Sequence, residues 1–328
     1  MKALQLGILS VSGFFKKRIA IPVPKSPLID ISAIASRSLD KAQNAAQEYA
    51  ISKAYGSYEE LLADQDIEAV YIPLPNHLHA QFIKQAADAG KHILCEKPIA
   101  LDANEATECI TYAENKGVKV MEAFMYRFHP QWQHVRELIR MKEIGKVLHV
   151  HCFFGYNNTD PNNIRNQAEA GGGAIMDIGC YAVSCSRFIF DAEPKRVMAL
   201  TTYDDKFGTD ILSSGTLDFG EGRAQFTIAT QIFPYQRVVV NGTGGIISID
   251  IPFNTPSDVE SRITITNSVG TREVLISPED QYILEFEAFA KAIREDTSVP
   301  TPPSDAIANM KVLDALRKSG KENQWISI

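Results

Sequence analysis

The tetrapeptide Cys95-Glu96-Lys97-Pro98 places a charged pair and a proline at the end of a short apolar run. Residues 92–95 predict a buried strand, and residues 103–116 predict a helix after it. In an open parallel sheet, ligands bind just beyond the carboxyl ends of the strands. A lysine half withdrawn from water there can have its pKa lowered toward the working pH and can handle a substrate proton. Taken alone, the motif is more typical of an ordinary strand–helix loop, so its interpretation depends on the rest of the chain.

The turn after the first predicted strand shares some features with a dinucleotide-binding loop. In that fingerprint, glycines give the tight turn and the close approach to pyrophosphate. Here Ser10 and Ser12 occupy the places of the first two glycines, and only Gly13, followed by Phe14, is nearby. Serine hydroxyls can still donate to phosphate, and a helix N-terminus binds anions. The turn alone fits a cofactor loop and an ordinary strand–helix turn equally well.

The end of the second predicted strand favours NADP over NAD. The segment Ser36-Arg37-Ser38 contains no acidic residue, and the first one after it is Asp40. An NAD site uses an acidic side chain for the ribose 2′-hydroxyl, whereas an arginine accommodates a 2′-phosphate. Arg37 can also lay its guanidinium on the adenine face. We therefore expect NADP as the cofactor, with NAD as the alternative.

Two histidine pairs are candidate metal ligands by spacing. His77 and His79 follow the fourth predicted strand, and His149 and His151 share one face of a later strand. Neither pair has a cysteine or a carboxylate beside it to complete a ligand set. The sequence therefore predicts no metal site.

A second group of polar residues follows the glycines at 171–173. Asp177 and Tyr181 are four residues apart, so they share one face if this segment is helical. Three successive glycines allow the backbone to approach a ligand or a neighbouring strand closely. Together with Lys97, an acid and a phenol would make a proton-handling group beside a nicotinamide. Without Lys97, a helix cap and a partly buried aromatic residue would explain the pair equally well.

Alternating apolar strands and helical patterns cover the first part of the chain, residues 1–122. The continuous Ile, Val and Leu runs are typical of strands covered on both faces, and a βαβ series implies a parallel, doubly wound Rossmann-like sheet. The predicted strands are 3–9, 29–35, 69–72, 92–95 and 119–122, and the predicted helices are 39–49, 58–63, 79–89 and 103–115.

From residue 123 to 328 the pattern changes to an α+β domain with one large, mainly antiparallel sheet. Connections between neighbouring strands are too short for parallel crossovers. The predicted strands are 147–154, 196–202, 213–219, 223–229, 238–240, 246–250 and 262–266, and the predicted helices are 130–141, 178–190, 281–295 and 304–318. These helices are too few to cover both faces of the sheet, so one face is left open. Residues 226–229 carry apolar side chains that would make an exposed face adhesive, so we expect association through it.

Composition narrows the class of protein. The 328 residues carry a net charge of −7, which argues against a nucleic-acid-binding surface. No apolar run approaches the length of a membrane span. The five cysteines are scattered through apolar patterns and resemble reduced core residues. We therefore expect a cytoplasmic protein without nucleic-acid or membrane partners.

Taken in order, several motifs resemble those of the glucose-fructose oxidoreductase / inositol dehydrogenase (Gfo/Idh/MocA) family, and the likeness covers nearly the whole chain. They are Leu74-Pro75-Asn76-x-x-His79, Glu96-Lys97-Pro98, Glu122 to Pro130, Gly171 to Tyr181 and the C-terminal helix pair. Within the family, the chain is most similar to the dihydrodiol dehydrogenase and NADP-dependent xylose dehydrogenase branch. The serines at 10 and 12 depart from the family's glycines, which concerns cofactor affinity and not the fold.

The resemblance implies roles for individual residues. It implies catalysis by Lys97 and Tyr181, with Asp177 contacting substrate hydroxyls, and substrate binding also by Arg127. The arginines at 127 and 165 would be cleft-lining residues or ordinary surface residues. It further implies a cis Lys97-Pro98 bond and a homodimer or a pair of dimers. The cofactor-binding residues implied are Ser10, Ser12, Gly13, Phe14, Ser36, Arg37, Leu74, Pro75, Asn76, His79, Glu96, Lys97 and Arg165.

The sequence thus predicts an NADP-dependent dehydrogenase or reductase that acts on a secondary hydroxyl. The substrate would be a small polyol, a sugar or a cyclic diol. A protein of the same fold that senses a ligand without turnover is the alternative, and the two serines of the first turn are its best support. Retention of Lys97, Asp177 and Tyr181 favours the enzyme, since a sensor needs no proton-transfer group.

Overall fold

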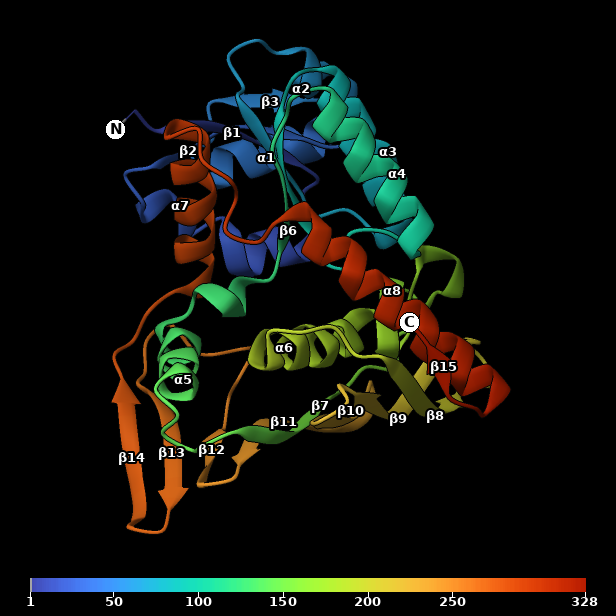
Figure 1. Ribbon diagram of the computed structural model, residues 1–328. Coiled ribbons are helices and arrows are strands. Elements are labelled where there is room, and N and C mark those ends of the chain that lie inside the picture. The colour runs from blue at the N-terminus through green and yellow to red at the C-terminus, as the bar shows by residue number, and fades with distance from the viewer. Residues whose placement is uncertain (1) are drawn as a thin grey trace. The chain divides into compact units, whose positions relative to one another are not determined.

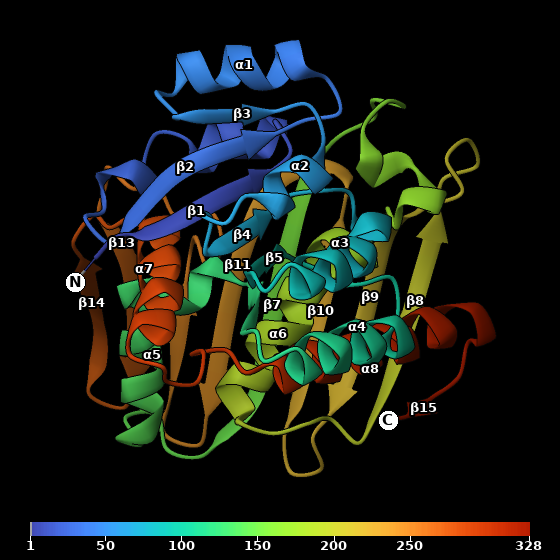
Figure 2. The same ribbon diagram turned by 90° about the horizontal axis from the view of Figure 1, so that it is seen from above.

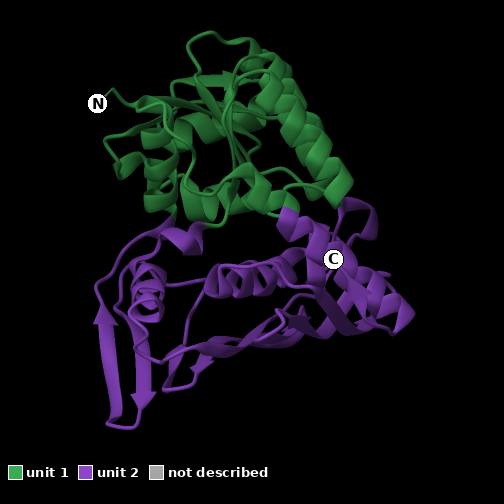
Figure 3. Cartoon of the chain, in the orientation of Figure 1, with its two compact units in different colours: residues 1–124, 282–307 green, residues 125–281, 308–328 purple. Residues whose placement is uncertain are grey.

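The computed structural model describes residues 2–328, which divide into two compact units (Figures 1 and 3). The first contains the chain up to Phe124 together with Tyr282–Ile307, and the second contains Met125–Gln281 and Ala308–Ile328. The predicted boundary at 122/123 lies close to the first crossing, but the predicted second domain also included residues 282–307. These join the first unit because Phe286 packs its ring edge-on against Tyr71, with centroids 5.0 Å apart. A helical pattern does not show which unit a helix packs against.

A six-stranded sheet forms the core of the first unit, in the order β3-β2-β1-β4-β5-β6, and every pairing is parallel. This is the predicted doubly wound architecture. The three-residue strand β3 was not predicted, because it is too short to show a pattern. The strands are β1 Leu4–Leu9, β2 Ile29–Ala35, β3 Lys53–Tyr55, β4 Ala69–Ile72, β5 His92–Glu96 and β6 Val120–Ala123.

Capping residues define where most helices of the first unit begin. Ser38, Ser57 and Asp102 each accept a hydrogen bond from the backbone N–H three residues later. The predicted helix 79–89 instead begins at Asn76, directly after the extended Pro75. Helices α3 and α4 lie side by side (Figures 1 and 2). The helices are α1 Leu39–Glu48, α2 Tyr58–Ala63, α3 Asn76–Asp88, α4 Ala103–Asn115 and α7 Gln281–Arg294, with short turns at Phe15–Ile19 and Val23–Lys25.

A nine-stranded sheet dominates the second unit, in the order β14-β13-β12-β11-β7-β10-β9-β8-β15. Only β7 and β10 pair in parallel, so the sheet is mainly antiparallel, as predicted. The edge strands β14 and β15 were not predicted. The strands are β7 Val147–Asn157, β8 Arg196–Tyr203, β9 Asp210–Asp218, β10 Arg223–Ala229, β11 Gln231–Gly242, β12 Gly245–Ile249, β13 Ser261–Asn267, β14 Gly270–Ile276 and β15 Ile326–Ser327.

The helices α5 (Pro130–Arg140) and α6 (Cys180–Phe190) lie on one face of this sheet (Figure 1). Phe226 and Ile228, at 2% and 0% exposure, belong to the buried face, so they are not the adhesive residues expected on the open one. Alternation puts Thr227 on the open face, where the exposed apolar side chains include Leu200, Leu212 and Tyr235. The remaining helical segments of this unit are Met125–Phe128, Ile164–Asn166, Ala168–Ala170, Ile175–Gly179 and most of α8 (Pro303–Glu322).

One helical stretch, Ala168–Phe190, is long and apolar enough to cross a membrane by length and composition. However, 89% of its most apolar window is buried inside the protein. Burial of this kind is what a core helix shows. This stretch contains Asp177 and Tyr181, so both residues lie on an element that is fixed by packing.

Candidate active site

The turn after β1 keeps a backbone conformation that favours glycine, although it carries serine. Ser10 has φ +131°, a region that L side chains rarely adopt. The Ser12 hydroxyl accepts a hydrogen bond from the Phe15 N–H at 3.0 Å and so caps the short helix that follows. A Cβ at Gly13 would meet nothing within 4 Å, which leaves the turn open to a bound group. The backbone therefore fits a pyrophosphate despite the two replacements.

The end of β2 fits the predicted 2′-phosphate contact. Ser36 is buried, and its hydroxyl accepts a hydrogen bond from the Ser38 N–H. Arg37 is exposed and forms no ion pair within residues 2–328. Its guanidinium is therefore available to an anion at this edge of the sheet, and no carboxylate of the protein competes for it.

The lysine loop after β5 is anchored by a buried carboxylate. Lys97 is half-buried, and the Lys97–Pro98 peptide bond is cis, as the family resemblance implied. Just beyond it, the Ile99 N–H donates to Oε1 of Glu122 at 2.9 Å. Glu122 is only 1% exposed and belongs to β6, the neighbouring strand. This bond ties the lysine loop to the edge of the sheet.

His79 joins the lysine loop to the loop after β4 instead of facing a ligand. It is fully buried, with Nδ1 2.9 Å from the carbonyl oxygen of Pro98 and Nε2 2.8 Å from that of Leu74. Burial lowers the pKa of His79 to about 4, so the ring is neutral at pH 7. A neutral ring carries one N–H, so His79 donates to one of the two carbonyl oxygens while its other nitrogen faces the second, and both nitrogens are turned toward the main chain. The predicted direct contact of His79 with the cofactor is therefore replaced by a role in positioning two loops.

Two buried polar residues near Glu96, Tyr71 and Glu285, were not identified by the sequence analysis. The Tyr71 hydroxyl donates to Oε1 of Glu96, and Tyr71 is fully buried. Glu285 of α7 is 1% exposed, and burial together with the charge of Glu96 raises its pKa well above the ordinary value. Burial and the charge of Glu96 therefore both favour the neutral form of Glu285. No signal short of the folded structure links α7 to this loop.

Asp177 in the second unit is held by two donors on the same oxygen. The Tyr156 hydroxyl donates to Oδ2 of Asp177 at 2.6 Å, and Arg165 donates to the same atom through Nε at 2.9 Å. Asp177 is 9% exposed. The structure therefore places Arg165, predicted as a cofactor contact, directly on the predicted substrate-binding carboxylate. The sequence analysis missed Tyr156, although strand alternation in phase with the buried Phe154 could have found it.

Tyr181 begins the first turn of α6 and is packed among aromatic rings. Its ring centroid lies 5.1 Å from that of Phe253 and 5.7 Å from that of Phe154. Its hydroxyl lies 3.5 Å from Sδ of Met125. A negative charge on Tyr181 would raise the pKa of Arg165, which indicates that the two side chains are close enough to interact. Tyr156, Arg165, Asp177 and Tyr181 thus form one cluster within the second unit.

The glycines and a buried aspartate fix the start of this helical segment. A Cβ on Gly172 would lie 2.5 Å from the Arg165 carbonyl oxygen, and one on Gly173 would lie 2.1 Å from Oδ1 of Asp210. Oδ2 of Asp210 accepts a hydrogen bond from the Ile175 N–H at 2.7 Å. Burial raises the pKa of Asp210 to about 6. The glycines therefore let the backbone lie close to neighbouring segments, as predicted. Those segments are the turn that contains Arg165 and strand β9.

Arg127 does not line a substrate site. Its guanidinium is 7% exposed and donates through Nη2 to the Ser184 hydroxyl at 2.7 Å. It also lies over the ring of Phe188, 5.2 Å from the centroid. The predicted substrate contact is therefore wrong. A buried arginine can satisfy its donors inside a core, and the motif around it does not reveal this.

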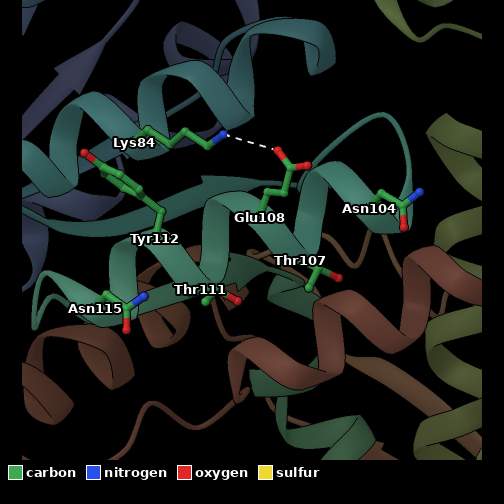
Figure 4. A pocket seen from close by; sticks show the side chains of 7 residues that line it. All are labelled: Lys84, Asn104, Thr107, Glu108, Thr111, Tyr112 and Asn115. Atoms are coloured by element: carbon green, nitrogen blue, oxygen red, sulfur yellow. Dashed lines mark ion pairs between the residues drawn. The ribbon is translucent and has the colours of Figure 1, made fainter.

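Two other features of the described residues carry no part of the site. Residues 2–328 contain no group of three or more histidine, cysteine, aspartate or glutamate side chains placed to hold a metal ion. A shallow groove of about 690 Å³ lies in the first unit, between α3 and α4 (Figure 4). Its lining is polar and includes the exposed ion pair of Lys84 with Glu108, but none of the predicted site residues.

Comparison with protein families identifies the class of both units. Residues 5–124 match the model of the Gfo/Idh/MocA oxidoreductase family with an NAD-binding Rossmann fold, and residues 132–248 match the C-terminal domain of that family. An uncharacterized oxidoreductase of Rhizobium meliloti, ORF334, is 39% identical and covers all of both chains. The chain therefore belongs to the Gfo/Idh/MocA family of nicotinamide-dependent oxidoreductases, and the predicted fold class and enzyme class are confirmed.

Relatives with named activities cover most of the chain. The D-xylose 1-dehydrogenase (NADP(+)) 2 of Haloferax volcanii is 37% identical over 99% of this chain and 100% of the relative. The trans-1,2-dihydrobenzene-1,2-diol dehydrogenase of Xenopus tropicalis is 35% identical over 80% of this chain and 78% of the relative. A 3-ketoreductase of Actinomadura kijaniata, solved in complex with NADP and TDP-benzene, aligns with a TM-score of 0.91 at 26% identity, covering 97% and 98% of the two chains.

Proposed function

We propose that this protein is an NADP-dependent dehydrogenase or reductase that acts on a secondary hydroxyl of a sugar, a small polyol or a cyclic diol. The carrying observation is the cluster around Asp177. A carboxylate held by Tyr156 and Arg165 stands four residues before the phenol of Tyr181. Such a cluster can orient hydroxyls and accept a proton. The named relatives, which include a xylose dehydrogenase and a dihydrodiol dehydrogenase, support this substrate class.

The proposal assigns cofactor binding to the first unit and substrate binding to the second. Arg37 would take the 2′-phosphate, and the turn at Ser10–Phe14 would take the pyrophosphate. Bound NADP supplies the nicotinamide ring that accepts or gives the hydride. The remaining residues of the first unit assigned to cofactor binding are Ser36, Leu74, Pro75, Asn76, Glu96 and Lys97, whereas Arg165 of the second unit contacts Asp177.

Three side chains would divide the proton chemistry. In the oxidation direction the phenolate form of Tyr181 accepts the proton of the substrate hydroxyl and becomes the phenol, and the positive charge of Lys97 favours that phenolate before the transfer. Asp177 accepts hydrogen bonds from substrate hydroxyls and so fixes the reacting carbon. His79 and Glu122 act indirectly, because they hold the loop that carries Lys97.

We also propose a homodimer or a pair of dimers that associates through the open face of the nine-stranded sheet, in a cytoplasmic setting. Leu200, Leu212 and Tyr235 are 70%, 40% and 50% exposed there, and a second copy would remove them from water. All five cysteines are free and buried, in keeping with a reducing compartment. Light scattering at micromolar concentration that gave a monomer of 36.3 kDa would contradict the association.

The enzyme is tested by NADPH fluorescence titration followed by turnover on a panel of sugars, polyols and cyclic diols. We expect tight NADPH binding and NADP reduction with at least one member of the panel. Tyr181→Phe should retain the binding and lose about a hundredfold in turnover, because only the hydroxyl is removed. Binding of NADPH without turnover of any panel member would favour the ligand-sensing alternative.

A further inference from the structure

Tyr156 is the side chain in the Asp177 cluster that has no role so far. It lies near the carboxyl end of β7, the strand on which α6 packs. Its hydroxyl donates to Oδ2 of Asp177 at 2.6 Å, while Arg165 donates to the same oxygen at 2.9 Å. Two donors from separate segments therefore converge on one carboxylate oxygen and fix the direction in which the carboxylate plane faces.

Both donors keep their protons throughout the ordinary pH range. Burial, and after it the charge of Asp177, raises the pKa of Tyr156 above its usual value. The charge of Asp177 likewise raises the pKa of Arg165. Each donor favours the ionised form of the carboxylate that it contacts. Tyr156 can therefore only donate to Asp177, and it cannot serve as a proton acceptor in the reaction.

We propose that Tyr156 is a positioning residue that holds the Asp177 carboxylate in the orientation needed to bind substrate hydroxyls. The inference rests on the proposed function, in which Asp177 binds the substrate. It adds that Tyr156 and Arg165 reach Oδ2 from two separate segments, so that each donor restrains the carboxylate from a different side. The bond from Tyr156 therefore helps to order the carboxylate before the substrate arrives, and this ordering does not lower substrate affinity.

The test is the steady-state kinetics of Tyr156→Phe with a panel member that the wild-type enzyme turns over. Loss of one charge-assisted hydrogen bond should raise KM by roughly ten- to a hundredfold. kcat should change by less than about threefold, and the Kd of NADPH should be unchanged. A Tyr156→Phe enzyme with wild-type KM, or one that loses kcat and leaves KM unchanged, would overturn the inference.

A second measurement separates positioning from general support of the fold. In the Asp177→Asn background, Tyr156→Phe should add little to KM, because it acts through the charge that has already been removed. Full additivity in log KM would contradict the inference. Tyr112→Phe is the matched control, since Tyr112 donates to Asp88 at the same 2.6 Å on the exposed surface of the first unit. It should leave KM and kcat unchanged.

The outcome also distinguishes the inference from the proposed function. If the wild-type enzyme turns over no sugar, polyol or diol, the proposed function fails and the role of Tyr156 fails with it. If wild-type turnover is clear and Tyr156→Phe has a normal KM, only the role of Tyr156 fails. Circular dichroism and a cooperative melt of Tyr156→Phe show whether an increase in KM comes from a folded protein.

Discussion

The two units hold their candidate catalytic groups with different kinds of bond. The loop of Lys97 is fixed by contacts between side chains and the main chain: the Ile99 N–H donates to Glu122, and the ring of His79 lies between two carbonyl oxygens. Asp177 is fixed by bonds between side chains, from Tyr156 and Arg165. When an anchor holds main-chain groups, the residues of the anchored loop can be substituted without losing it, because their N–H and carbonyl groups remain. When an anchor holds a side chain, as at Asp177, substitution of either partner removes it, which suits a site that sets substrate choice.

The largest effect is expected from substitution of Lys97, the candidate catalytic residue of the first unit. Lys97→Ala should lower turnover by at least about a hundredfold, which is the usual contribution of acid–base help. The loop itself should keep its conformation, because it is anchored without the lysine side chain. NADPH binding and a cooperative melt should be retained, as fluorescence titration and calorimetry can check. Lys84→Ala is the control, since Lys84 forms an exposed ion pair with Glu108 in the same unit. Near-normal turnover of Lys97→Ala would remove the catalytic role.

The same contrast explains what the sequence could show. The ends of the predicted strands in the first unit were correct to within one or two residues, because each motif lies next to its own strand, as with β2 and β5. The partners of Asp177 lie 12 and 21 residues earlier in the chain, and only the folding of the second unit brings them together. Burial of Arg127 and His79 depended on packing that no local pattern records. The segments that carry the candidate residues could therefore be predicted, whereas the bonds between those residues could not.

A smaller effect, on cofactor binding, is expected at Arg37, which takes no part in anchoring the Lys97 loop. Arg37→Ala should weaken NADP binding by roughly ten- to a hundredfold, because one charge-assisted pair with the 2′-phosphate is lost. NAD binding should change little, since NAD lacks that phosphate. The two dissociation constants can be measured by calorimetric titration. An equal loss for both cofactors would contradict the assignment of Arg37 to the phosphate.

One buried titratable group in each unit should shape the pH dependence of stability, with opposite signs. The pKa of His79 is lowered to about 4, so its contribution is present above pH 6.5 and is lost as the pH falls through 4. The pKa of Asp210 is raised to about 6, so its contribution is present below pH 3.8 and is lost as the pH rises through 6. Each slope is at most about 1.4 kcal/mol per pH unit.

Urea unfolding between pH 4 and pH 6.5 can separate the two groups. His79→Gln should remove a rise of stability with pH, and Asp210→Asn should remove a fall. The two variants should therefore change the slope in opposite directions, whatever their effect on absolute stability. No change of slope for one variant would show that its group titrates at its ordinary pKa in the folded protein, and a change in the same direction for both would show that one of the two pKa values is shifted the other way.

The smallest effects are expected at the two serines of the first turn, and they should also differ in sign. Ser10 has φ +131°, so Ser10→Gly should relieve strain and raise the free energy of unfolding by about 1 kcal/mol. Ser12 caps a helix, so Ser12→Ala should lower it by about 1 kcal/mol through loss of the bond to the Phe15 N–H. Chemical denaturation of the two variants measures both values. If Ser10→Gly destabilised the protein, the Ser10 hydroxyl would have to make a contact worth more than the strain, and the turn would be better described as built for serine than as a glycine turn carrying replacements.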